Sequence, residues 1–137
     1  MRRVGWLLVL ALACGPRPLV GPEAPDLRPV EVGRAFATAV LEEAREVEAL
    51  RWVEPDVALG VRSQVGFLSG PGRKVVFRVE TPRQQSGSWV VAVPIESLTL
   101  GEVRYIGQMQ LQLREDGRRV SRSVLLLERS DGVRISL

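Results

Sequence analysis

The sequence predicts an α+β fold, with an N-terminal helix or helix pair packed on a curved antiparallel sheet of five or six strands. Apolar residues recur at helical spacing between positions 32 and 50, and the pattern changes to alternation from position 57 onward. Two pairs, Asp116-Gly117 and Asp131-Gly132, are typical of tight turns between strands, because glycine readily adopts positive φ. Together these features place helices before a meander of strands.

Residues 1–13 have the composition of a bacterial secretory signal peptide. A basic start, Met1-Arg2-Arg3, precedes an apolar run that is too short to span a bilayer as a helix, which needs about 20 apolar residues. The following segment, Leu10-Ala11-Leu12-Ala13-Cys14, resembles the lipobox of bacterial lipoproteins, although Ala11 stands where leucine is commonest in that family. The resemblance implies that Cys14 receives a diacylglyceryl group and that the chain is cut before it.

A lipid on Cys14, the only cysteine, would anchor the chain to a membrane of the cell envelope with its domain outside the cytoplasm. Two or three acyl chains, at about 0.8 kcal/mol per buried methylene, hold a protein firmly without a spanning segment. The alternatives are a buried core cysteine or a chance match to the lipobox.

Residues 14–29 are expected to form a tether, because five of the nine prolines fall between residues 15 and 29 without apolar periodicity. A single α+β domain is expected over residues 30–137. Removing the signal leaves 17 basic and 16 acidic residues, so charge gives no indication of a nucleic-acid partner. Arginine outnumbers lysine 18 to 1 and asparagine is absent, which fits a thermophilic bacterium or GC-driven codon bias.

The first part of the domain is expected to be helical. Val32, Phe36 and Val40 repeat at helical spacing, and the opposite side is charged. A break over residues 42–45 separates a longer helix from a shorter one, and Pro55 ends the helical region.

In the rest of the domain, apolar and polar residues alternate with a period of two, so this part is expected to form strands. The expected strands are Val57–Phe67, Val75–Val79, Trp89–Ile95, Val103–Arg114, Val120–Glu128 and Val133–Leu137.

Three segments resemble the nuclear transport factor 2-like (SnoaL-like) superfamily. They are the first helix from Pro29 through Phe36 to Ala39, the Glu54-Pro55-Asp56-Val57 segment, and the closing Asp131-Gly132-Val133-Arg134-Ile135, where tryptophan is usual in place of Val133. The resemblance implies a cone-shaped α+β domain. The chain departs from it in the middle, where the third helix of many members has little room. A cystatin-like helix on a four- or five-stranded sheet is the alternative fold.

The chemical inventory does not favour an enzyme. There is no histidine, which removes histidine-based metal sites, triads and general bases, and no metal or cofactor is expected. Enzymes of the resembling superfamily place Asp, His, Tyr or Arg inside the cone. Glu80 and Glu96 lie in or beside expected strands, where a buried carboxylate could act as a base and an exposed one would not.

Two sets of residues are candidates for binding. Four aromatic residues could line a cavity or could be ordinary core: Phe36, Trp52, Trp89 and Tyr105. Gln108, Gln110 and Gln112 form a polar row on one strand, which could hydrogen-bond a partner protein or a glycan, or could be a solvated sheet face.

The function expected from these features is that of a membrane-anchored envelope lipoprotein, acting as a non-enzymatic interaction or assembly module. The expected partners are the membrane, through lipid on Cys14, and another envelope protein. The alternative is an apolar small-ligand binder that uses the cone interior, and an isomerase- or hydrolase-like enzyme is a third and weaker hypothesis.

Overall fold

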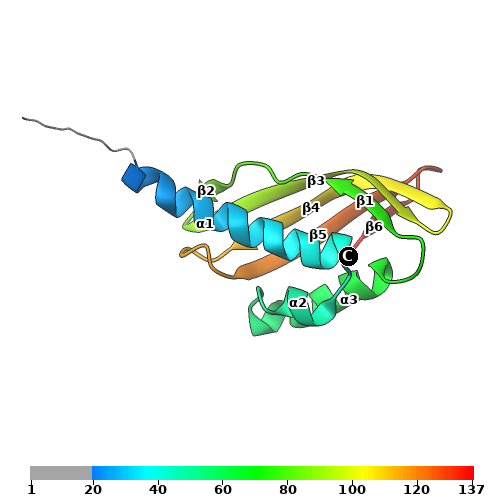
Figure 1. The fold of residues 1–137 in the computed structure, drawn as a ribbon, viewed down its shortest axis with the longest axis horizontal. Coiled ribbons are helices and arrows are strands. Elements are labelled where there is room, and N and C mark those ends of the chain that lie inside the picture. Colours follow the sequence, from blue (N-terminus) through cyan, green and yellow to red (C-terminus); the bar gives the residue numbers. More distant parts are fainter. Residues whose placement is uncertain (1–19) are drawn as a thin grey trace, which may run out of the picture.

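The computed structural model describes residues 20–137, with side chains from residue 28 onward. It confirms the α+β class, because three α-helices precede an open, antiparallel six-stranded sheet (Figure 1). The helical elements are α1 (Val20–Ala37), the π-helical turn η1 (Thr38–Glu42), α2 (Glu46–Leu50), the 3₁₀ turn η2 (Pro55–Val57) and α3 (Ala58–Leu68). The strands are β1 (Lys74–Phe77), β2 (Arg83–Gln85), β3 (Ser88–Leu100), β4 (Val103–Leu113), β5 (Val120–Arg129) and β6 (Arg134–Ser136).

Helix α1 begins at Val20, ten residues before the position expected from the sequence. Residues 20–29 are therefore helical and do not form the extended tether that was expected, whereas residues 14–19 lie outside the described part. Of the prolines in α1, only Pro22 lies in the first turn, where the N–H groups have no helical partner; Pro25 and Pro29 lie farther along, where proline removes a backbone hydrogen bond. Pro29 is buried, with its ring against the backbone of Gly117, so packing favours the helical conformation over an extended one.

The prediction of a strand for residues 57–67 is wrong, since most of this segment forms α3. Val61, Val65 and Leu68 are buried on one side of the helix. Their spacing of four and three residues is helical, but Val57, Val61 and Val65 also fall on one parity, so the apolar pattern fits both periods.

The strands follow the order β1-β3-β4-β5-β6, with β2 also paired to β3. Strands β3 and β4 form the longest pair, running from Trp89 opposite Leu113 to Leu100 opposite Val103. Both predicted Asp-Gly turns have a glycine with positive φ, at 70° for Gly117 and 94° for Gly132. The β2–β3 turn was not predicted. Its central residues, Ser86 and Gly87, both have positive φ, which matches the twist of a tight hairpin.

All described helices lie on one side of the sheet, where α1 crosses in front of the strands in Figure 1. The core fills the space between them, and Phe36 of α1, Val91 of β3 and Leu125 of β5 are fully buried there. The opposite side of the sheet is left without a covering layer among the described residues, and we call it the outer face.

Candidate functional site

The outer face carries the alternate side chains of β3, β4 and β5. Because paired residues of neighbouring strands point to the same side, the register defines rows across the sheet. The rows are Arg83–Val90–Gln112–Arg122, Ala92–Gln110–Val124, Pro94–Gln108–Leu126–Ser136 and Ile106–Glu128–Arg134.

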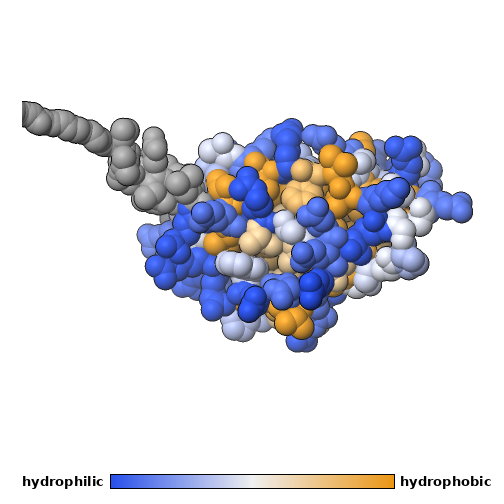
Figure 2. All heavy atoms as spheres, in the orientation of Figure 1, coloured by the Kyte–Doolittle hydropathy of each residue, from blue (hydrophilic) through white to orange (hydrophobic). Residues whose placement is uncertain are grey.

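The three predicted glutamines lie in the middle of this face. Gln110 is exposed, and Gln108 and Gln112 are half-buried. The neighbouring positions on β3 and β5 are mainly apolar, so the amides form a polar ladder between two apolar strips. Figure 2 shows the opposite, helix-covered side, which is mostly hydrophilic with scattered apolar patches. The outer face thus combines amide and apolar groups, as the fully buried centre of a protein interface commonly does.

A shallow groove of about 990 Å³ crosses one end of the outer face. Its apolar lining includes Pro94, Ile106 and Leu126, and Gln108 contributes the end of the amide ladder. Ile106 keeps 58% of its surface exposed, which is unusual for a large apolar side chain on a sheet. The lining also includes three charged residues, Glu96, Glu128 and Arg134.

The strands change course beside this groove. The β3–β4 register shifts between Ile95 and Leu98, which marks a bulge. On β4, a Cβ at Gly107 would collide with the carbonyl oxygen of Leu126, so only glycine permits this approach of β4 to β5.

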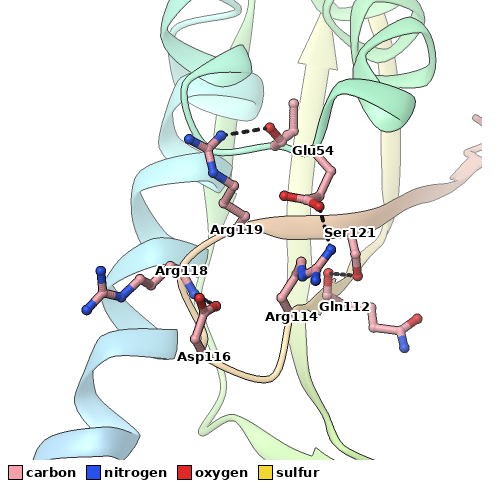
Figure 3. Close-up of polar contacts among 8 residues, drawn as sticks. Glu54, Gln112, Arg114, Asp116, Arg118, Arg119 and Ser121 are labelled. Atoms are coloured by element: carbon pink, nitrogen blue, oxygen red, sulfur yellow. Dashed lines mark hydrogen bonds and ion pairs between the residues drawn. The ribbon is translucent and has the colours of Figure 1, made fainter.

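The arginines of the β4–β5 hairpin mostly make structural contacts (Figure 3). The guanidinium of Arg114 lies 2.7 Å from the carboxylate of Glu54, and Arg119 donates to the carbonyl of Val53 at 3.2 Å. The backbone N–H of Arg118 donates to the Asp116 side chain at 3.0 Å. These bonds stabilise the hairpin and connect it to the segment between α2 and η2.

The two ends of the outer face differ in charge. Arg83 and Arg122 belong to one row at the end nearest this hairpin, and neither forms an ion pair with a side chain that the structure describes. Near the groove, Arg78 lies 3.4 Å from Glu80 and 3.5 Å from Glu96, so one guanidinium is shared by two carboxylates.

The two carboxylates in or beside strands that were considered as possible bases, Glu80 and Glu96, are exposed. The side chains of Glu80 and Glu96 retain 48% and 58% of their accessible surface. The clearest perturbed carboxyl is Asp131, whose pKa is lowered chiefly by its hydrogen bonds with the Arg129 guanidinium and then by the backbone N–H of Val133. Arg129 ends β5 and Asp131 lies in the exposed turn that follows, where a structural ion pair between them accounts for the shift.

The four aromatic candidates do not converge on one cavity in the described structure. Phe36, Trp89 and Tyr105 are buried and Trp52 is half-buried. Trp89 lies opposite Leu113, and Tyr105 is eight residues away from Leu113 on the same strand, or about 27 Å at 3.4 Å per residue.

Each of the two separated aromatics has its own local partner. The Trp89 indole donates to the Glu115 carbonyl at 3.1 Å. The Tyr105 ring packs edge-to-face against Phe67, with the centroids 5.9 Å apart.

Gln64 of α3 is a notable residue that the sequence pattern did not single out. Its side chain is fully buried, and its Nε2 donates to the carbonyls of Ser123 and Leu137 at 3.0 and 3.2 Å. Its Oε1 accepts from the Ser123 hydroxyl at 3.0 Å. The amide thus connects α3 to the edge of β5, and its place in an apolar segment was the only available signal.

Cys14, the predicted lipid attachment residue, lies outside the described residues. Over residues 20–137, no helix has the combination of length and apolar character that crossing a membrane requires. The described part of the chain also contains no cluster of three or more acidic, cysteine or histidine residues that could hold a metal ion.

Comparisons with protein-family models, curated proteins and solved structures found no match to this chain. Its function must therefore be argued from its own residues.

Proposed function

We propose that this chain is a membrane-anchored bacterial envelope lipoprotein that acts as a non-enzymatic interaction module through its outer face. The lipobox-like segment ending at Cys14 supplies the anchor in this proposal. Anchoring raises the local concentration of the domain near membrane or periplasmic partners, which strengthens modest contacts.

The observation that carries the proposal is the composition of the uncovered sheet face. A solvated sheet face normally alternates apolar-in and polar-out, so its outer positions are polar. Here Val90, Pro94, Val124 and Leu126 occupy outer positions beside the glutamine row. Covering these apolar side chains removes apolar surface from water and so lowers the free energy, and the amides provide hydrogen bonds that fix the position of a partner.

The proposal is tested by replacing Gln108, Gln110 and Gln112 with glutamate in the lipidated protein. A partner would have to desolvate three carboxylates, each costing about 1–3 kcal/mol or more when unpaired, so co-purification from detergent-solubilised membranes should be lost. The melting temperature should change little, because these side chains lie on the uncovered side of the sheet.

A matched control places the same charge change on the helical side. Ser63→Glu, Leu59→Glu and Val47→Glu alter exposed positions of α2 and α3 and should retain the partner. Equal partner recovery from the glutamine variant and from the wild type would contradict an interaction role for the outer face.

The groove favours a second candidate, an apolar small-ligand binder. The space between helices and sheet is occupied by core side chains, so a ligand would bind among Pro94, Ile106 and Leu126 on the outer side. An organic molecule retained by the purified wild type and lost in Leu126→Glu would support this candidate. An isomerase- or hydrolase-like activity has less support, because the strand carboxylates considered for it are exposed.

A further inference from the structure

We propose that the outer face binds a second copy of this chain, packed sheet against sheet about a two-fold axis. This inference rests on the proposed interaction role of that face and identifies the partner. Three properties of the face support it: its symmetry of side-chain types, its charge distribution and its size.

The register defines where the axis would pass. A 180° rotation about an axis that runs across the strands, midway between two facing sheets, reverses the strand direction. If the axis lies over the row Val93–Met109–Leu125, residues equally distant from this row face each other in the two copies. Gln110 then faces Gln108 of the second copy.

The resulting pairs are chemically matched. An amide both donates and accepts, so two facing glutamines satisfy each other without any other group. On β5, Val124 faces Leu126 of the second copy, and on β3, Ala92 faces Pro94. The glutamine ladder therefore pairs with itself, and each apolar strip covers its own counterpart.

Charged residues match in the same arrangement. Arg122 is three residues before Leu125 and Glu128 is three residues after it, so each Arg122 faces a Glu128 of the other copy. On β3, Val90 faces the bulge at Glu96, whose carboxylate lies 3.5 Å from Arg78 of its own copy, so the main charge pair of this arrangement is Arg122 with Glu128. Reversing the strand direction brings the arginine end of one face onto the glutamate-containing end of the other, which favours this orientation over the parallel one.

The face is large enough for a stable pair. Strands β3, β4 and β5 contribute at least ten residues each, and the short β1, β2 and β6 together contribute ten more. At about 3.4 Å by 4.8 Å per residue, these strands cover roughly 650 Å² per copy. Two copies would bury about 1,300 Å², which lies within the usual range of roughly 1,200–2,000 Å² for specific complexes.

Site-specific crosslinking of the full chain in its own membranes tests the arrangement. With Gln110→Cys, close to the axis, a short bismaleimide should produce a covalent dimer. Ser63→Cys, on the exposed side of α3, should give none, and this control also accounts for any reaction of Cys14. Equal crosslinking of the two variants would overturn the proposal.

A charge exchange tests the predicted register. In the Gln110→Cys background, Arg122→Glu or Glu128→Arg alone should weaken dimerisation about tenfold, because like charges then face each other. The double variant Arg122→Glu/Glu128→Arg should restore crosslinking, since opposite charges face each other again. A double variant that crosslinks no better than the single variants, while retaining the wild-type melting temperature, would contradict this register.

The two proposals can fail separately. A chain that does not crosslink, but recovers a different envelope protein through its glutamines, contradicts self-association and leaves the interaction role in place. A chain that crosslinks, but whose Cys14 carries no lipid by intact mass, supports self-association and contradicts the anchor.

Discussion

A single buried amide connects the helical layer to the edge of the sheet. Strand β6 pairs with β5 from Leu126 to Glu128, and Val53 forms a bridge with Val120 at the start of β5, so the stretch of β5 between them has no partner strand on this side. Gln64 satisfies the Ser123 carbonyl there, and the backbone of Leu137 pairs with Leu125 beside it. The side chain thus stands in for a neighbouring strand and protects this edge from pairing with another chain.

Gln64→Leu should lower the free energy of unfolding by about 1–3 kcal/mol, because the carbonyl and the hydroxyl of Ser123 lose their partner in a part-buried place, whereas the Leu137 carbonyl still accepts from the Leu125 N–H. Chemical denaturation of this variant and of the wild type gives the difference. The neighbouring exposed change Ser63→Leu should stay within about 0.5 kcal/mol of the wild type. If both variants are equally stable, Gln64 is not the connection described.

Asp131 makes the stability of the β5–β6 turn depend on pH. Its carboxylate accepts two hydrogen bonds from Arg129, at 3.0 and 2.8 Å, and one from the Val133 N–H at 3.2 Å. Its pKa is lowered, so the ionised form is favoured in the folded state. The stabilisation is therefore present above the ordinary carboxyl pKa of about 4 and is lost as the pH falls through the lowered value.

Asp131→Asn should consequently melt at a lower temperature than the wild type near neutral pH, and the difference should shrink in acid. Melting curves of both proteins from about pH 7 down to about pH 2 measure this convergence. A difference that stays constant over the whole range would show that the charge of Asp131 does not stabilise the turn.

At the scale of the strands, one glycine determines how closely β4 and β5 approach. The backbone of Leu126 occupies the space where a side chain at position 107 would start. Gly107→Ala should destabilise the domain by about 1–3 kcal/mol, as overpacking in a fitted core does.

Gly66→Ala provides a control, because it should change the stability in the opposite direction. Gly66 lies in α3 with no atom within 4 Å of an added Cβ, so alanine should stabilise the helix by about 0.5–1 kcal/mol. Equal melting temperatures for the two alanine variants would contradict the close approach of β4 and β5.

The order of helices and strands could be predicted where one period dominates. Strand β4 alternates cleanly between polar and apolar residues, so its position and faces were predictable. Helix α3 was not, because Val57, Val61 and Val65 fit both periods and the glycines at 60 and 66 weaken the helical signal. Strand β2 is three exposed residues long, and pairing with β3 rather than an apolar pattern defines it.

The candidate site was predictable only in part. Alternation on β4 placed the three glutamines on one face, and the structure leaves that face uncovered by any described helix. The groove depends on how β3, β4 and β5 bend together, which no single segment encodes. Alternation on β5 also places Arg122 and Glu128 on one face, but the position of Arg83 in the row of Arg122 requires the register between strands.

For the whole molecule, the central expectation is that the outer face is covered when the protein is in its membrane. Hydroxyl-radical footprinting of intact membranes tests it, with each residue's oxidation rate normalised to that of the unfolded chain. Ile106 on the outer face is 58% exposed in the single chain, whereas Val47 and Leu59 on the helical side are 76% and 75% exposed. Ile106 should be protected several-fold more than Val47 and Leu59. Comparable oxidation of all three residues would contradict it.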